Sequence, residues 1–512
     1  MASQESRLQN DIEILHGLGY AQELRRAMGG FSNFAISFTI ISILTGAITL
    51  FSYGFGNGGP LEEGLGWPII ALFTVFVALS MAELASAFPT AGALYYFAGR
   101  LGSPAWSYYT GWFNLIGQIT ITAGIDYGCA LFAVPLLGLP ADPAHTLVVY
   151  AVILLLHGVI NHVGTRVVST FNSISAWWHM VGVIVIVAAL LSVAHHPFAY
   201  AFSSGITTVK GLPYGYLFLI GLLQAQWTFT GYDASAHVSE ETNEAARYAP
   251  RGIILSVVVS AIFGYILLMG LTLASGSYAH VMGQSNPVIA IMQDGLGSTV
   301  GTFLLWVIVI AMWFCGLASV TSNSRMIYAF SRDGALPFSQ FVHKVHHHYR
   351  VPVRAIWLAV VGALVPMLIG AFSPYVYSIV TSISVIGLYV AYVIPVYLGR
   401  RTWGTRWTRK GPFDLGRLSA PIAWIAICWV IFISIVLVLP EAPLPVTLGN
   451  MNWALPTLAF VILCVTIAWF TSVRHWFKGP RAQGTIEELA QIEAELEEGS
   501  PAGAGSLAPD ET

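Results

Sequence analysis

The chain has 512 residues, of which 56% are apolar and only 9% are charged, and its formal net charge at pH 7 is −3. Soluble domains carry about 25% charged residues, so this composition leaves too few charges to cover a soluble enzyme of this size. The net charge also excludes a nucleic-acid-binding protein that depends on a basic surface.

Twelve apolar segments are long enough to cross a bilayer, which takes roughly 20 residues of helix. Barrel strands would be short and alternating, whereas these segments are continuously apolar, so the pattern predicts an all-α membrane protein. In chain order the segments cover residues 31–54, 67–88, 105–133, 144–161, 167–193, 213–236, 252–274, 298–325, 353–372, 374–398, 421–440 and 452–472.

The distribution of lysine and arginine predicts how these segments are oriented, because basic residues concentrate in cytoplasmic loops. With both chain termini in the cytoplasm, every basic residue except Lys210 falls in a cytoplasmic segment. We therefore expect residues 1–30 and 473–512 to be cytoplasmic, in a multi-pass protein of the plasma membrane or of a bacterial inner membrane.

The cytoplasmic tail contains one further predicted helix. Thr485 and Glu488 have the spacing of a capping box, and apolar residues then recur at helical spacing. These residues are Ile486, Leu489, Ile492 and Leu496. The helix is acidic, and it either rests on a cytoplasmic loop or makes a regulatory contact. Residues 499–512 are expected to be disordered.

Two predicted membrane helices carry Thr-Gly near mid-membrane, the first at Thr45-Gly46 and the sixth at Thr230-Gly231. Segments 1–5 and 6–10 would then have opposite topology with interruptions at corresponding positions, which is typical of an inverted-repeat transporter. An interrupted helix exposes N–H groups that attract a carboxylate and carbonyl groups that attract an ammonium group. We therefore expect a small zwitterion to bind between the two interruptions.

Four motifs carry a resemblance to a known family. They are Ser42-Ile-Leu-Thr-Gly-Ala47, Glu83-Leu-Ala-Ser-Ala-Phe-Pro-Thr-Ala-Gly-Ala93, Phe229-Thr-Gly-Tyr-Asp-Ala-Ser-Ala-His-Val-Ser-Glu-Glu241 with Pro250-Arg251, and Ser324-Arg-Met-Ile-Tyr-Ala-Phe-Ser-Arg-Asp-Gly-Ala-Leu-Pro337. In this order they resemble the amino acid/polyamine/organocation superfamily of secondary transporters. The first and third motifs are most similar to its amino acid/choline branch, which includes γ-aminobutyrate permeases.

The resemblance implies a leucine-transporter-type fold in which helices 1 and 6 are unwound at mid-membrane. Ten helices over residues 31–398 would form two inverted repeats, about 31–193 and 213–398, and two more helices would follow within 421–472. The implied function is uptake of amino acids or related amino compounds by alternating access. Choline or polyamine transport and substrate exchange stay open, as does a permease-derived sensor or channel. No enzyme active site, cofactor site or metal site is expected.

The substrate is expected to lie between the two interruptions. The expected contacts are Ser42, Thr45, Gly46 and Ala47 for the carboxylate, with Trp227, Thr228, Thr230 and Gly231 on the opposite wall. Trp227 precedes the second interruption and is either a gate or a packing aromatic.

Ionisable groups within membrane segments are costly and therefore indicate function. Asp126 in the third segment would meet a substrate amine, relay a proton, or simply pack against another helix. Asp233 is either a proton-coupling group or a cap of the second half-helix. Near His179 several proton-coupled relatives carry a lysine, so this residue is either a coupling group or a neutral core histidine.

Two further expectations concern ions. A sodium ion bound at the eighth segment would need oxygen ligands, but Ala318 has no hydroxyl, and of this neighbouring pair only Ser319 supplies one. We therefore expect the proton to be the coupling ion. Glu240 and Glu241 are expected to form ion pairs with Arg247 or Arg251 near the cytoplasmic end of the sixth segment.

Overall fold

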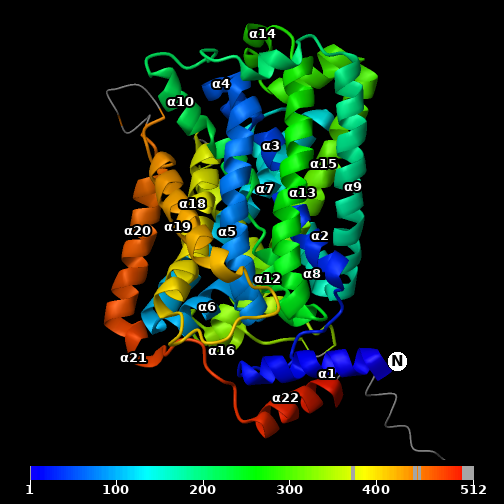
Figure 1. Ribbon diagram of the computed structural model, residues 1–512. Helices are drawn as coiled ribbons and strands as arrows, with labels where there is room; N and C mark the ends of the chain where they lie inside the picture. Colours follow the sequence, from blue (N-terminus) through cyan, green and yellow to red (C-terminus); the bar gives the residue numbers. More distant parts are fainter. Residues whose placement is uncertain (1, 347, 371–374, 442–446, 448–450, 499–512) are drawn as a thin grey trace, which may run out of the picture.

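The computed structural model describes residues 2–346, 348–370, 375–441, 447 and 451–498, and its regular elements are helices throughout this part of the chain. Long helices run roughly along one common axis (Figure 1). Helices α1 (Ala2–Gly17) and α22 (Ile486–Glu498) lie across one end of the bundle, which we call the terminal end. Helices α4 (Phe51–Gly58), α10 (Tyr214–Gly221) and α14 (Tyr278–Met282) mark the opposite end, which we call the far end.

Eleven helical stretches of the described residues are long and apolar enough to cross a membrane. The first predicted segment comprises α2 (Gly30–Ile41), α3 (Gly46–Thr49) and α4, and the second comprises η1 (Glu62–Gly66) and α5 (Trp67–Ala87). The other segments are α7 (Pro104–Leu136), α8 (Pro143–Val163), α9 (Thr165–Ser192), α13 (Ala245–Ala274), α15 (Pro287–Arg332), α17 (Val353–Gly370), α18 (Val376–Thr402), α19 (Ser419–Val436) and α20 (Ala454–Ala468). Helix α15 is kinked near its start, at Gly297.

The predicted sixth segment, residues 213–236, is absent from those eleven stretches of the described chain because it is divided into short helices. They are α10, α11 (Leu223–Thr228) and α12 (Ala234–His237). With this divided segment, all twelve predicted segments are represented by helix. The predicted boundary between the ninth segment, 353–372, and the tenth, 374–398, lies outside the described residues.

The first membrane segment is interrupted at Ser42, where α2 ends. Ser42 has φ +28°, a left-handed conformation that a non-glycine residue rarely adopts, so the helix cannot continue. Its carbonyl then accepts the N–H groups of Thr45 at 2.7 Å and Gly46 at 3.0 Å, from which α3 starts. The interruption therefore keeps part of its backbone paired inside the protein, as the lipid environment requires.

The sixth segment is interrupted between Phe229 and Asp233, where Gly231 adopts φ +87°. A Cβ at this position would overlap the side chain of Ile40 on α2, so both the backbone conformation and the close approach of α2 require glycine. The Thr-Gly pairs of the sequence thus mark both interruptions.

The terminal end is closed by two buried ion pairs between α15 and the turn η3 (Ser239–Glu241). Arg325 donates to both carboxylate oxygens of Glu241 at 2.8 and 2.9 Å, and Arg332 donates to both oxygens of Glu240 at 3.0 Å. The prediction that these glutamates pair with Arg247 or Arg251 is therefore wrong. The arginines that the fold brings to them lie about a hundred residues further along the chain than the glutamates, beyond the reach of local spacing rules.

The chain termini pack together at the same end. The predicted capping box is confirmed, since Thr485 N–H donates to Glu488 at 2.7 Å and Glu488 N–H donates to the Thr485 hydroxyl at 3.3 Å. Helix α22 buries Leu489 and reaches α1 through a 2.8 Å contact between His16 Nε2 and Glu493. The predicted disordered stretch, 499–512, lies outside the described residues.

The buried pair at the terminal end generates a stability prediction. Glu241→Ala would leave the Arg325 charge buried without its partner, so we expect the free energy of unfolding to fall by about 3–5 kcal/mol. Arg7→Ala is the control, because Arg7 is 65% exposed in its pair with Glu244 and should change the value by less than about 1 kcal/mol. Unfolding of the purified protein in detergent measures both, and equal stabilities would contradict the assignment.

Candidate functional site

The two helix interruptions meet inside the bundle. A Cβ on Gly46 would lie 2.5 Å from the hydroxyl oxygen of Thr228 and 2.7 Å from its Cα, so α3 and α11 touch at this glycine. Nearer the terminal end, the Ser37 hydroxyl of α2 donates to the Tyr232 carbonyl at 2.9 Å. The half-helices of the first and sixth segments are therefore in direct contact around the predicted site.

A small cavity of about 10 Å³ lies where the interruptions meet. It is lined by Ile40, Ile41, Thr45, Gly46, Ile121, Ile125, Trp227, Thr228 and Thr230. Five of the predicted contacts are thereby brought together, and the other walls are apolar side chains of α2 and α7. This volume suits roughly one water molecule, so a larger ligand requires the half-helices to move apart.

The remaining predicted residues of the two interruptions are engaged in hydrogen bonds beside the cavity. Ser42 Oγ lies 2.6 Å from Thr45 Oγ1, and the Ala47 carbonyl accepts from Gln224 Nε2 at 3.0 Å. Gly231 N–H donates to the Tyr392 hydroxyl at 3.3 Å. These residues therefore shape the cavity through hydrogen bonds rather than by lining it.

His179 contacts the first interruption from α9. Its Nε2 lies 2.7 Å from Ser42 Oγ, and its Nδ1 lies 2.8 Å from the Ser175 carbonyl. A neutral ring with its proton on Nδ1 satisfies both contacts, with the Ser42 hydroxyl donating to Nε2. The fold therefore connects this buried imidazole to the turn that carries Thr45 and Gly46.

Asp233 makes no side-chain cap to α12. Its carboxylate instead accepts from Tyr392 at 2.8 Å, from Gln118 at 2.9 Å and from Asn114 at 3.3 Å. His237 Nε2 lies 3.2 Å away. The carboxylate thus joins α7 and α18 to the sixth segment.

The contacts of the α18 tyrosines and of Gln118 on α7 with the sixth segment were not predicted from the sequence. Tyr389 and Tyr392 lie three residues apart, so both face the sixth segment, where Tyr389 donates to the Phe229 carbonyl at 2.6 Å. The spacing was visible in the sequence, but the helix they brace is remote in the chain.

Asp126 is not among the residues that line the cavity. One carboxylate oxygen lies 3.2 Å from His157 Nδ1 of α8, and the other lies where a Cβ on Gly316 of α15 would overlap it. Both side chains are fully buried. Asp126 thus sits at a junction of α7, α8 and α15.

A larger pocket of about 460 Å³ opens at the far end, and we call it the vestibule. It is lined by Thr49, Leu50, Ser52, Tyr53, Gly56, Asn57, Thr208, Val209, Tyr375, Tyr377, Ser378, Ile379, Glu441, Met451 and Asn452. Tyr377 packs edge-on against Trp227, with ring centroids 6.0 Å apart. Because Trp227 lines the cavity and Tyr377 lines the vestibule, this aromatic pair separates the two spaces.

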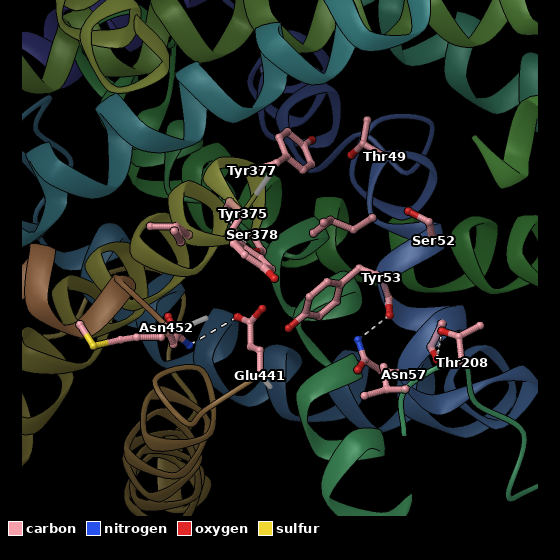
Figure 2. Close-up of a pocket in the computed structure, with 15 residues that line it drawn as sticks. Thr49, Ser52, Tyr53, Asn57, Thr208, Tyr375, Tyr377, Ser378, Glu441 and Asn452 are labelled. Atoms are coloured by element: carbon pink, nitrogen blue, oxygen red, sulfur yellow. Dashed lines mark hydrogen bonds between the residues drawn. The ribbon is translucent and has the colours of Figure 1, made fainter. Parts of the chain in front are cut away.

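Glu441 is the acidic residue among those lining the vestibule. Figure 2 shows its carboxylate facing the Tyr53 ring, and Asn452 Nδ2 donates to it at 3.4 Å. Burial raises the pKa of Glu441 to about 7, while hydrogen bonds with Tyr53 and Ser378 act in the opposite direction. The vestibule therefore gains a negative charge as the pH rises through neutrality.

Comparison with known proteins decides which family has this arrangement. The model of the amino acid permease family matches residues 28–466. The chain belongs to the amino acid permease family. It is a transporter of amino acids rather than an enzyme, as the sequence motifs indicate.

Individual relatives agree with this assignment. The permease is 39% identical over 494 residues to the amino-acid permease BAT1 homolog of Oryza sativa subsp. japonica, covering 91% of this chain and 94% of the relative. It is 38% identical over 495 residues to the amino-acid permease BAT1 of Arabidopsis thaliana, covering 91% and 95%. It is also 28% identical over 472 residues to the GABA-specific permease of Saccharomyces cerevisiae, covering 87% and 81%.

The contact between the interruptions predicts the effect of filling it. Gly46→Leu would drive a side chain into Thr228, so we expect the permease to reach the membrane yet lose amino acid uptake. Gly215→Leu on α10 is the matched control, since a Cβ there meets nothing within 4 Å. Uptake into proteoliposomes measures both variants, and normal transport by Gly46→Leu would refute the site.

The vestibule carboxylate predicts a pH-dependent affinity. Above pH 7 the ionised Glu441 attracts the ammonium group of an amino acid, whereas below pH 7 the carboxyl is neutral. Glu441→Gln should therefore raise KM about fivefold near pH 8, corresponding to a charge interaction of about 1 kcal/mol, and leave it unchanged near pH 5.5. An equal change at both pH values would point to a packing effect instead.

Proposed function

We propose that this permease takes up an amino acid, or a small amino compound such as γ-aminobutyrate, by proton-coupled alternating access across a plasma or bacterial inner membrane. The observation that carries the proposal is the meeting of two interrupted helices at a nearly closed cavity. One side of this cavity leads through an aromatic pair to the vestibule, and the other is sealed by buried ion pairs.

The proposed orientation places the terminal end in the cytoplasm. Basic residues engage that end: Arg350 donates to the Glu23 carbonyl at 2.6 Å, and Lys410 contacts Glu83 at 2.6 Å. Basic residues on one side of a membrane bundle indicate its cytoplasmic face. The vestibule then opens outward, and the inverted repeats 31–193 and 213–398 rock or gate around the cavity.

In the proposed binding mode, the carboxylate of the substrate meets the N–H groups and hydroxyls of the first interruption. Thr45 supplies its hydroxyl, and the N–H groups of Thr45 and Gly46 join it when they leave the Ser42 carbonyl that they contact in this structure. Ser42 and Ala47 hold the turn. Thr228, Thr230 and Gly231 form the opposite wall, and Trp227 moves as the outer gate. Side chains with a formal charge are absent from the lining among the described residues, which favours a zwitterion over choline or a polyamine.

We propose His179 as one proton-coupling group. In the neutral ring, Nε2 accepts the Ser42 hydroxyl, whereas a protonated ring would donate from Nε2 to Ser42 Oγ. The Ser42 hydroxyl would then turn to Thr45, 2.6 Å away, and change the groups that the turn presents to a carboxylate. Asp233 is the second candidate, because a proton on its carboxylate would release Tyr392.

Sodium is a weaker candidate for the coupling ion. Ser319 Oγ lies 2.7 Å from Thr122 Oγ1, so the hydroxyl of the eighth segment already has a protein partner. Cys315 places a sulfur atom 3.3 Å from the Ile40 carbonyl, and sulfur is a poor ligand for a hard cation.

Uptake of labelled amino acids into proteoliposomes tests the proposed function. We expect saturable accumulation of a zwitterionic substrate when the outside is acidic, and no accumulation with a sodium gradient alone. Ohmic current would indicate a channel, binding without flux a sensor, and uptake that requires internal substrate an exchanger. Preferential transport of choline or a polyamine would refute the zwitterion assignment.

A variant addresses the coupling group directly. His179→Ala removes the ring that contacts Ser42, so the maximal uptake rate of this variant should lose its dependence on external pH. His145→Ala is the control, because this partly exposed histidine pairs with Asp142 at the start of α8. Unchanged pH dependence in His179→Ala would exclude His179 as a coupling group.

A further inference from the structure

Two consecutive glutamates are buried where the second membrane segment begins. Glu62 is 2% exposed and Glu63 is 1% exposed, and both belong to the π-helical turn η1 that precedes α5. π-Helical turns are rare and often occur at functional sites. Neither carboxyl group belongs to the cavity or to the groups proposed above for coupling.

These carboxyl groups lack the partners that the buried acids Glu241 and Asp233 have. Within the described residues, neither oxygen of Glu62 and only one oxygen of Glu63 has a hydrogen-bond partner. That one contact is the Gln224 side-chain amide, 3.2 Å from Glu63 Oε2. By contrast, Glu241 has Arg325 and Asp233 has several donors.

Three glycines pack closely against the carboxyl group of Glu62. A Cβ on Gly58 of α4, on Gly66 of η1 or on Gly221 of α10 would overlap one of its carboxylate oxygens. The carboxyl group thus fits closely between three elements. Two of them, α4 and α10, belong to the interrupted segments.

The titratable groups that face this pair are themselves neutral or acidic. Tyr53 of α4 and Tyr214 of α10 lie within electrostatic range of Glu62, as does Glu63. Tyr265 of α13 donates to the Gly64 carbonyl at 3.4 Å. Among the described residues, no lysine, arginine or histidine forms an ion pair with either glutamate. A buried carboxylate without a cation is costly, and a proton neutralises it most simply.

The pair lies between the vestibule and the first interruption. Asn57 lines the vestibule, and the next residue, Gly58, contacts Glu62. On the other side, the Gln224 amide that contacts Glu63 also donates to the Ala47 carbonyl at 3.0 Å. One side-chain amide therefore links this acid pair to the turn that is proposed to hold the substrate.

We propose that Glu62 and Glu63 form a proton-loading site on the vestibule side of the permease. The inference rests on the proposed proton-coupled uptake and names the groups that take the proton from the outside. A proton from vestibule water binds a carboxylate oxygen and forms a neutral carboxyl group, which the glycine-lined space accommodates. Parting of α4 and α10 lets vestibule water deliver this proton, and opening of the terminal end then lets water from the cytoplasmic side take it away.

The proton on Glu63 also affects the substrate turn. An ionised Glu63 is the stronger acceptor and draws the Gln224 amide toward itself, away from the Ala47 carbonyl. When Glu63 is neutral, the Gln224 amide keeps its hydrogen bond to the Ala47 carbonyl. This bond holds the first interruption in the conformation seen in the structure. Proton loading and the shape of the turn are coupled in this way.

The test uses the full-length permease in proteoliposomes, with labelled γ-aminobutyrate and a panel of amino acids as probes. For one proton per zwitterion, a gradient of one pH unit sustains about tenfold accumulation. Glu62→Gln and Glu63→Gln imitate the protonated acids, so at least one should lose this accumulation and still exchange internal for external substrate. Asp294→Asn, an exposed carboxylate at the far end, should behave like the unaltered permease.

A second measurement does not depend on transport. Protonated carboxyl groups have a distinct infrared carbonyl band, and in the purified permease this band should persist at neutral pH. The variant that loses accumulation should also lose intensity in this band.

The outcomes separate the hypotheses. Variants that accumulate substrate normally, or that lose accumulation and exchange together, would overturn the proton-loading site, as would an unchanged infrared band. Accumulation by the unaltered permease that requires sodium would overturn it as well. Absence of both accumulation and exchange in the unaltered permease would instead refute the proposed function.

Discussion

Backbone hydrogen bonding in an apolar medium is the constraint on which this structure depends. A membrane helix can be interrupted only where the protein itself supplies partners for the freed peptide groups. The first interruption turns back on the Ser42 carbonyl, and the second is braced by Ser37 of α2 and by two tyrosines of α18. The contact between the two interruptions therefore depends on the partners that complete the backbone opened at Ser42 and at Gly231.

The two ends of the bundle are closed by different interactions, so the cavity opens more readily toward one end than toward the other. The terminal end is held by bidentate Arg–Glu pairs, in which separating the partners leaves charges buried and unpaired. Toward the far end, the cavity is closed by the contact of Trp227 with Tyr377, which a ring rotation can release. Opening toward the vestibule is thus the easier step, and opening of the terminal end requires a compensating gain such as bound substrate.

Local features of the sequence predicted much of this architecture. Segment length and apolar composition located the helices, the Thr-Gly pairs located both interruptions, and the Thr485–Glu488 spacing located the last helix. Contacts between remote segments could not be predicted in this way. The pairing of Glu241 with Arg325 and the bracing tyrosines depend on how helices pack, and local spacing carries no information about that packing.

Glu62 and Glu63 show the same limit at a finer scale. The predicted segments ended at 54 and resumed at 67, which placed both glutamates in a connecting loop where carboxylates are ordinarily solvated. The structure extends helix through η1 and closes α4 and α10 around it, so the acids are buried instead.

A proton-driven carrier needs a carboxyl group whose preferred charge differs between its open and closed states. Glu241 is held by an arginine, and the Asp233 carboxylate is held by several donors. An acid enclosed by glycines of moving half-helices has no donors when they close and gains water when they part. Because its surroundings change when the half-helices move, Glu62 in η1 suits proton exchange better than the ion-paired acids do.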